Sequence, residues 1–226
     1  LALSGKVVCA STFAMFAAGR AFEIIRNSIG YTHANVKICA THAGITVGED
    51  GASHQTFEDI ALMRTIPGMT VLNPSDGVSA RALIKQAVAF YGPAYIRLGR
   101  AAVPTFYTEE MAAKLEIGKG VCLRTGDKKD GKPADATVIA TGIMVNEAML
   151  AAEELAANGI EVRVIDMHTI KPLDADIIYR AARETGAIVT AEEHSVIGGL
   201  GSAVAEVTAT HYPVKMAMVG QQDTFG

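Results

Sequence analysis

The feature that most constrains the fold is a regular alternation of short apolar runs with longer amphipathic runs. In the first half, the apolar runs at 6–11, 36–41, 69–72 and 94–98 have the length and character of buried strands. The stretches between them, at 15–29, 56–64 and 77–90, have the pattern of helices. Such alternation predicts a parallel sheet with helices on both faces.

The second half repeats the pattern. Strands are expected at 137–141, 162–166, 187–191 and 214–219, and helices at 144–157, 174–184 and 201–211. The rhythm breaks over 101–118, where Pro104, an exposed Tyr107 and a short acidic helix are expected. Residues 119–136 then form a strand and a polar hairpin. We therefore predict an α/β protein with two doubly wound domains, each with a mainly parallel sheet, at 1–103 and 119–226, joined by a linker at 104–118.

Composition narrows the class of protein. Half of the 226 residues are hydrophobic and 19% are charged, which is typical of a globular protein with a sizeable core. The net charge of −4 gives no electrostatic case for nucleic acid or an anionic membrane as a partner. No apolar run approaches the roughly 18 residues of a membrane span. The cysteines are odd in number and scattered along the chain, at Cys9, Cys39 and Cys122. They are expected to be reduced and to be buried as small hydrophobic residues in a cytoplasmic protein.

Both ends of the chain are unusual. It opens with Leu1-Ala-Leu-Ser-Gly5, which has no methionine and resembles the last turn of a helix with its cap. It closes with Asp223-Thr-Phe-Gly226 directly after an apolar strand. We expect both ends to be cut from a longer polypeptide, so that the first domain lacks its N-terminal part.

The most informative polar cluster is His42-Ala-Gly-Ile-Thr-Val-Gly-Glu-Asp50-Gly-Ala-Ser-His54. It follows a predicted strand, and open α/β sheets bind their ligands at the carboxyl ends of strands. Histidine exchanges a proton near neutral pH, and Asp50 can orient a histidine or hold a hydroxyl. The spacing of His42 and His54 does not suggest zinc, because no cysteine or third histidine lies close by, so no metal site is predicted.

Other side chains are expected at the same edge. Phe13 and Phe16 follow the first strand, where they either pack in the core or form a flat slot for an aromatic cofactor ring. Arg97 and Arg100 end the fourth strand, where they either grip a phosphate or make a surface salt bridge. The sequence alone leaves these alternatives open.

A glycine-rich turn follows the third strand of the second half. Glu192-Glu-His194 precedes Gly198-Gly-Leu-Gly201, which superficially resembles a dinucleotide-binding fingerprint. It lacks the third glycine at the required spacing, and its strand comes late in the unit. Close helix–strand packing or a subunit contact is the better interpretation, and His168 is expected to be a structured turn residue.

These motifs together resemble transketolase over essentially the whole chain, specifically its pyrimidine-binding and C-terminal domains. The most specific segment is Gly48-Glu-Asp-Gly-Ala-Ser-His-Gln55. The other matching motifs are Ser11-Thr-Phe-Ala-Met-Phe16, Ala40-Thr-His42, Asn73-Pro-Ser-Asp76, Ile96-Arg-Leu-Gly-Arg100 and Lys171-Pro-Leu-Asp174. The resemblance implies thiamine diphosphate as cofactor, and transfer of a two-carbon glycolaldehyde unit from a ketose phosphate to an aldose phosphate in the pentose phosphate pathway.

The resemblance also implies roles for individual residues toward the sugar. His42 and His54 would hydrogen-bond substrate oxygens and assist proton transfers, so both are candidate catalytic residues. Asp50 would accept a hydrogen bond from a substrate hydroxyl. Arg100 would bind the sugar phosphate, whereas Arg97 matches no family role.

Toward the cofactor, Phe16 together with Phe13 would wall the aminopyrimidine pocket. A third aromatic residue of the family's pocket matches Gly19 here, so this wall is thinner or is filled by another residue. The family's cofactor-activating glutamate, and its diphosphate-binding domain with the Mg²⁺ ligands, match nothing in residues 1–226. We therefore expect this chain to be inactive alone. It would act with an N-terminal transketolase section or subunit, in a homodimer or an α2β2 assembly.

Three other identities remain open at this point. 1-Deoxyxylulose-5-phosphate synthase uses the same cofactor, but the pairs Thr41-His42 and Glu49-Asp50 favour transketolase. The beta subunit of a 2-oxo acid dehydrogenase would not need the His, Asp and Arg set that suits a sugar phosphate. The last alternative is a non-catalytic assembly module whose sheet edges only hold partners.

Overall fold

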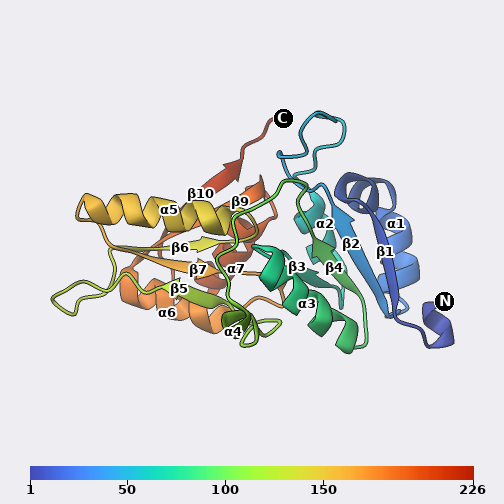
Figure 1. Cartoon of the computed structure of the whole chain (residues 1–226), viewed down its shortest axis with the longest axis horizontal. Helices are drawn as coiled ribbons and strands as arrows, with labels where there is room; N and C mark the ends of the chain where they lie inside the picture. The colour runs from blue at the N-terminus through green and yellow to red at the C-terminus, as the bar shows by residue number, and fades with distance from the viewer.

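The computed structural model describes all residues from 1 to 226 and contains two five-stranded sheets that lie side by side (Figure 1). The strand order is β1-β2-β4-β3-β8 in the first sheet and β10-β9-β6-β7-β5 in the second. Most neighbouring strands are parallel, and helices cover the sheets. The predicted fold class, two α/β units with mainly parallel sheets, is confirmed.

In the first sheet, β1 (Val8–Phe13), β2 (Val36–Thr41), β4 (Ala94–Arg97) and β3 (Thr70–Leu72) are parallel neighbours. All four residues of β4 are buried, as expected for a central strand of a sheet that is covered on both faces. Helices α2 (Asp59–Thr65) and α3 (Gly77–Ala89) belong to this half. As predicted, α3 begins at a cap, where Asp76 accepts the Ser79 N–H at 2.8 Å.

The segment between β1 and β2 differs from the single helix predicted there. It consists of a π-helical stretch at Met15–Arg20, a short α1 (Phe22–Ile24) and a second π-helical stretch at Ile25–Gly30. Gly19, which lies in the first stretch, has a low helix propensity and favours departure from regular α geometry. Such widened turns are frequent at functional sites.

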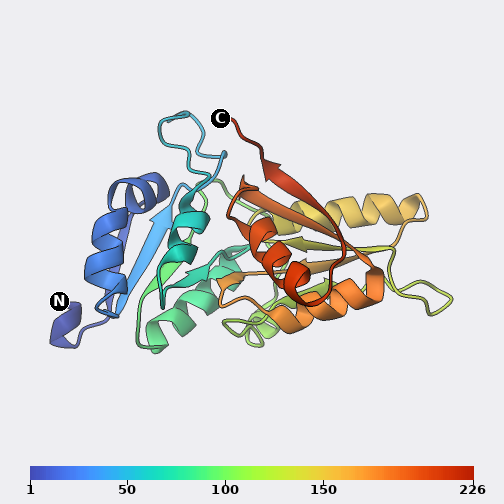
Figure 2. The ribbon, with the colours of Figure 1, turned by 180° about the vertical axis from the view of Figure 1, so that it is seen from behind.

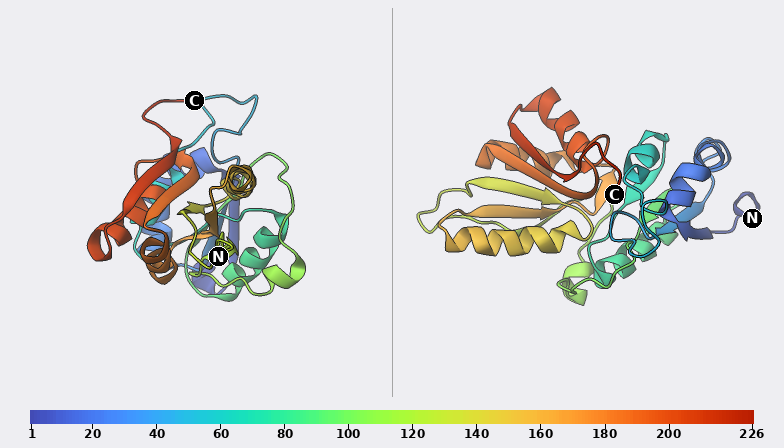
Figure 3. Two further views of the ribbon diagram at one scale, coloured as in Figure 1. Left: turned by 90° about the vertical axis from the view of Figure 1, so that its left-hand side faces the viewer. Right: turned by 90° about the horizontal axis from the view of Figure 1, so that it is seen from above.

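In the second sheet, β6 (Ala136–Ala140), β7 (Val162–Asp166), β9 (Ala187–Ser195) and β10 (Lys215–Gln221) pair in parallel. The edge strand β5 (Val121–Arg124) is antiparallel to β7. Helix α5 (Met144–Ala157) covers one face, and α6 (Ala175–Thr185) and α7 (Leu200–His211) cover the other (Figure 3). Asp174 caps α6 as predicted, accepting the Ile177 N–H at 3.3 Å.

Strand β8 (Thr169–Lys171) was not predicted, and it joins the two halves. It follows β7 in the chain but pairs antiparallel with β3 of the first sheet. The Lys171 Nζ donates to the carbonyl oxygens of Arg64 and Ile66, at 2.8 and 2.7 Å, where α2 ends. The halves therefore share backbone pairing, and their relative placement is fixed.

The termini lie far apart. The N-terminus leads into a short 3₁₀ turn, Ala2–Ser4, beyond the first sheet, and α4 (Glu109–Ala112) lies in the connection between the halves. The C-terminal residues return to the loop after β2, where Gly226 lies against the Gln55 side chain (Figure 2). None of the helices is both long and apolar enough to cross a membrane.

Two predictions about single residues are wrong. The three cysteines are free thiols, but Cys9 and Cys122 are exposed and Cys39 is half-buried, rather than all being buried. Cys9 and Cys122 lie on the edge strands β1 and β5, which are not enclosed by neighbouring strands on both sides. Tyr107, predicted to be exposed, is only 2% exposed, and its hydroxyl donates to Asp166 at 2.8 Å.

A buried ion pair lies where the two sheets meet. The Arg97 Nε, at the end of β4, donates to the Asp59 Oδ2 at 2.8 Å, and the Tyr95 hydroxyl donates to the same oxygen at 2.8 Å. The Arg97 Nη2 reaches across to the carbonyl oxygen of Glu193 in β9, at 2.8 Å. Burial alone would raise the pKa of Asp59, but the Arg97 guanidinium and these hydrogen bonds hold it below its ordinary value.

Replacing Asp59 by Asn should destabilise the fold strongly, because it leaves the Arg97 charge buried without a counter-charge. Breaking a buried pair by removing one partner costs about 3–5 kcal/mol. The midpoint of urea unfolding measures this effect. Glu109→Gln is the matched control, since it removes only the exposed pair with Arg81 and should change the midpoint little. Equal midpoints for the two variants would show that the buried pair is not a main support of the fold.

Candidate active site

The predicted site residues come from strands whose carboxyl ends meet at one edge of the first sheet. Strand β1 ends at Phe13, and β2 ends at Thr41, directly before His42. Strand β4 ends at Arg97, and Arg100 follows in the next loop. Because β1, β2 and β4 are parallel neighbours, these ends lie at the edge where α/β sheets bind ligands.

Four aromatic rings from three segments form one cluster at this edge. Phe13 stacks on His42, with ring centroids 3.9 Å apart and planes 10° apart, and on Phe16 at 6.0 Å. His54 presents its ring edgewise to Phe13 at 5.9 Å and to Phe16 at 5.2 Å. All four side chains are half-buried. We call this group the four-ring cluster; it joins the proposed cofactor wall to both candidate catalytic histidines.

The backbone of the loop from His42 to His54 is held in an unusual conformation. His42 has a φ of 59°, in the left-handed region that costs a non-glycine residue about 1–3 kcal/mol and that is concentrated at active sites. Thr41 Oγ1 lies 3.0 Å from its Nδ1. The base of the loop is closed by the Gly44 N–H, which donates to the Thr56 carbonyl at 3.1 Å, and by the Gln55 side chain, which donates to the Ile45 carbonyl at 3.1 Å. The two imidazoles are therefore placed by a constrained loop.

Arg100 lies against this loop. Its Nη2 donates to the Glu49 Oε1 at 3.0 Å, and 40% of its side chain is exposed, so the guanidinium remains accessible to an anion. A side chain at Gly48, whose φ is 84°, would come within 2.6 Å of the Arg100 Nη1. Asp50 is exposed, and its carboxylate makes no hydrogen bond within the chain. The structure thus brings Arg100 to the loop, whereas the exposed Asp50 makes no hydrogen bond to His42 or His54.

The cluster suits the flat ring of an aromatic cofactor. The Phe13 and Phe16 planes are only 15° apart, and both rings are partly accessible beside the imidazoles. The Arg20 guanidinium lies 4.9 Å from the centre of the Phe16 ring and follows Gly19, the position that matches the third aromatic residue of the family's pocket. No group of three or more His, Cys, Asp or Glu side chains is placed to hold a metal ion.

Comparison with known proteins identifies the family of the chain. Residues 1–105 match the family model described as the transketolase pyrimidine binding domain, and residues 128–226 match that of the transketolase C-terminal domain. A Methanocaldococcus jannaschii protein whose name describes a transketolase C-terminal section is 49% identical over 227 residues, covering 100% of this chain and 69% of that protein. The chain belongs to the transketolase family.

Two further relatives support membership of this family. The 6-deoxy-6-sulfo-D-fructose transketolase subunit of a Clostridium species (strain MSTE9) is 44% identical over 226 residues, covering 100% of this chain and 67% of that protein. A solved structure described as a split gene transketolase, an inactive beta4 tetramer, has a TM-score of 0.89 and 51% identity, covering 100% of this chain and 69% of that one. The resemblance to transketolase predicted from the motifs is confirmed.

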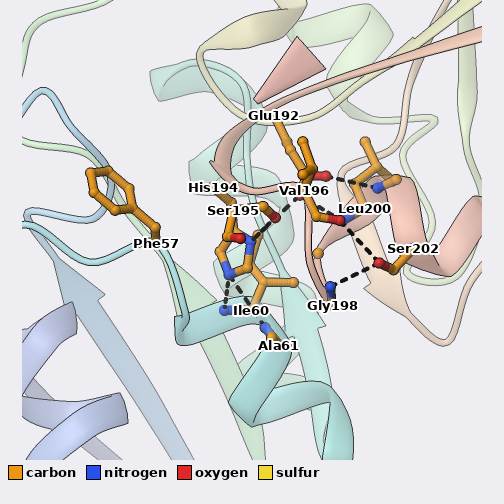
Figure 4. A network of polar contacts seen from close by, with 12 residues as sticks. Phe57, Ile60, Ala61, Glu192, His194, Ser195, Val196, Gly198, Leu200 and Ser202 are labelled. Atoms are coloured by element: carbon orange, nitrogen blue, oxygen red, sulfur yellow. Dashed lines mark hydrogen bonds and ion pairs between the residues drawn. The ribbon is translucent and has the colours of Figure 1, made fainter. Parts of the chain in front are cut away.

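In this chain, the Glu192-Glu-His194 segment at the end of β9 anchors neighbouring elements. The Glu192 carboxylate accepts the N–H groups of Leu200 and Gly201, at 2.6 and 2.8 Å, at the start of α7 (Figure 4). A side chain on Gly199 would overlap that carboxylate. The predicted close helix–strand packing is confirmed. Burial raises the pKa of Glu192 to about 7.

His194 makes the corresponding contact with the first sheet. Its Nδ1 lies 2.7 Å from the Ser195 carbonyl and donates to it, which leaves Nε2 as an acceptor. Nε2 accepts the N–H groups of Ile60 and Ala61, at 3.2 and 3.4 Å, in the first turn of α2 (Figure 4). The ring is fully buried, and burial lowers its pKa. A neutral imidazole therefore joins β9 of the second sheet to helix α2 of the first half.

Two residues proved to have structural positions that the sequence did not indicate. Arg97 is neither an exposed phosphate ligand nor half of a surface salt bridge, because it is buried against Asp59. The available sequence signal was that Arg97 lies inside the run 94–98, which was predicted to be a buried strand, whereas Arg100 lies outside it. His168, expected in a turn, is completely buried between β7 and β8, where burial lowers its pKa to about 4.

The neutral form of His194 should make stability depend on pH. A group whose pKa is lower in the folded state contributes stability above its unfolded pKa of about 6.5 and loses it as the pH falls through the folded pKa. The difference in melting temperature between the native chain and His194→Gln should therefore be largest at pH 8 and shrink toward pH 5. Thermal scans across this range measure it, with His211→Gln, at the exposed end of α7, as the control. A difference that does not change with pH would contradict the assignment.

Proposed function

We propose that residues 1–226 supply the sugar-binding side of the active site in a thiamine diphosphate-dependent transketolase. The reaction moves a two-carbon glycolaldehyde unit between a ketose phosphate and an aldose phosphate. The observation that carries this proposal is the four-ring cluster with the accessible Arg100 on the same sheet edge. Aromatic faces, proton-exchanging imidazoles and a phosphate-binding guanidinium are the groups that this reaction requires.

The residues of the cluster fit the cofactor's aminopyrimidine ring. Phe16 and Phe13 would hold this ring through their nearly parallel faces. When bound, thiamine diphosphate supplies the carbanion nucleophile and the electron sink for the reaction, while the protein orients the reactants and handles protons. The activating glutamate and the Mg²⁺ and diphosphate ligands would come from an N-terminal transketolase section or subunit.

Two histidines would handle protons on the sugar. His42 and His54 contact the same Phe13 ring, so one small substrate can reach both. Each can donate a hydrogen bond to a carbonyl or hydroxyl oxygen, and a positioned imidazole can act as a general acid or base in proton transfer. The exposed carboxylate of Asp50, on the same loop, would accept a hydrogen bond from a sugar hydroxyl and so help to select stereochemistry.

Arg100 would bind the terminal anion of the sugar. A guanidinium binds tetrahedral oxyanions through two parallel N–H groups, and Glu49 holds that of Arg100 against the loop. The Clostridium relative is named for a sulfonated sugar, in which a sulfonate takes the place of a phosphate. A terminal oxyanion common to both kinds of sugar supports this assignment.

The chain would act as part of an assembly. We propose that it is inactive alone, and that it works with the N-terminal section or subunit in a homodimer or α2β2 complex in the cytoplasm, within the pentose phosphate pathway. The solved relative is described as an inactive beta4 tetramer, which supports a requirement for a further component.

Replacing His54 by Ala should abolish most turnover of the assembled enzyme. A positioned acid–base group contributes ~10²–10⁴-fold, so transfer from xylulose 5-phosphate to ribose 5-phosphate should slow by about that factor. His211→Ala is the control and should retain full activity. Unchanged turnover in His54→Ala would favour the non-catalytic assembly module. Condensation of pyruvate with glyceraldehyde 3-phosphate by the native enzyme would identify a 1-deoxyxylulose-5-phosphate synthase.

Replacing Arg100 by Ala should weaken binding of phosphorylated sugars selectively. A hydrogen bond to a charged group contributes about 1.5–3 kcal/mol, so KM for xylulose 5-phosphate should rise ~10-fold or more. KM for unphosphorylated xylulose should change little, as should both constants in the exposed control Arg81→Ala. An equal rise in KM for the two sugars would remove Arg100 from the phosphate site.

A further inference from the structure

One carboxylate of the second sheet reaches into the His42–His54 loop. The Glu193 Oε1 accepts the Thr46 backbone N–H at 2.8 Å. Glu193 is only 9% exposed, although it lies at the carboxyl end of β9, far from Thr46 in the sequence. This contact therefore crosses from the second sheet to the loop that carries both candidate catalytic histidines.

The loop backbone is shaped to receive this carboxylate. Gly44 has a φ of 85°, which L side chains rarely adopt, and a Cβ there would overlap the Glu193 carboxyl group. The same glycine closes the base of the loop through Thr56. The carboxylate thus lies directly against the arm of the loop that runs from Gly44 to Thr46.

Glu193 is itself held on a rigid base. Its carbonyl oxygen accepts the Arg97 Nη2 at 2.8 Å, and Arg97 is paired with Asp59. Its neighbours Glu192 and His194 are bonded to the first turns of α7 and α2 (Figure 4). The side chain therefore projects from a backbone segment that is bonded on both sides.

The loop is held near its base, where Ala43 and Val47 are buried, whereas Glu49 and Asp50 at its tip are exposed. Beyond Thr46, the Gly51 N–H bonds within the loop to Gly48, and Glu49 meets the partly exposed Arg100. A cavity of about 200 Å³ lies beside Ile45 and is also lined by Met144 and Glu193. Without the carboxylate, the Thr46 N–H would lose its acceptor, and the adjacent Ile45 has space beside it into which it could shift.

We propose that Glu193 is a positioning residue for the sugar-binding loop. It makes no hydrogen bond to the ring of His42 or His54, and acts by fixing the Thr46 amide from the second sheet. The C-terminal half of the chain would then set the geometry of a site to which it contributes no catalytic side chain. The kinetic part of this proposal rests on the function proposed above.

The test uses the assembled holoenzyme and three variants of this chain. Glu193→Ala removes the acceptor, and Glu193→Gln retains an oxygen at the same position. Glu206→Ala is the matched control, since it removes another carboxylate of the C-terminal half that bonds across to Arg64 without touching the loop. Misplacement of reacting groups by about 1 Å can cost ~10²-fold in rate, so kcat/KM for xylulose 5-phosphate should fall by up to that factor in Glu193→Ala. Glu193→Gln should recover most of it, and Glu206→Ala should match the native enzyme.

Amide hydrogen exchange provides a readout that does not depend on activity. Peptides covering 43–55 should exchange faster in Glu193→Ala than in Glu206→Ala, with peptides of β6 and α5 unchanged. Unchanged exchange over 43–55, equal kinetic losses in Glu193→Ala and Glu206→Ala, or no recovery in Glu193→Gln would each overturn the proposal. Absence of transketolase activity in the native complex would instead refute the proposed function, while the exchange comparison would still decide whether Glu193 positions the loop.

Discussion

The ion pair between Asp59 and Arg97, buried where the two sheets meet, is the interaction on which the arrangement of the site depends. Neither charge has access to water, so each requires the other, and the start of α2 is thereby locked to the end of β4. The same guanidinium holds the Glu193 carbonyl of β9. Arg97 is thus bonded both to α2 and to β9, and it fixes the carboxyl end of β4 relative to the second sheet.

Several hydrogen bonds cross the junction between the two halves, beside an apolar core that also continues from one half into the other. His194 bonds to α2, Glu193 to the loop and Lys171 to the end of α2, while β8 extends the first sheet. Hydrogen bonds have direction, so such a junction defines one relative orientation more narrowly than an apolar contact does. The four-ring cluster and Arg100 belong to the first half, yet their placement depends on the second.

Much of the fold and of the site could be predicted from the sequence, because the periodicity that defines strands and helices is local. The gathering of Phe13, His42 and Arg100 followed from one rule, that parallel strands end at the same edge. The remainder depends on distant partners. Strand β8 has only three residues and exists through its pairing with β3, and the burial of Arg97 depends on Asp59, which lies in another element. Local periodicity along the chain does not show which distant residues will pair with one another.

The central claim is that the four-ring cluster and Arg100 form the sugar-phosphate side of a transketolase active site. A crystal structure of the assembled enzyme with thiamine diphosphate and xylulose 5-phosphate tests it most directly. The account predicts sugar oxygens within hydrogen-bonding distance of His42 and His54, with the phosphate on Arg100. A sugar bound away from the four-ring cluster, or a phosphate held by other residues, would contradict it.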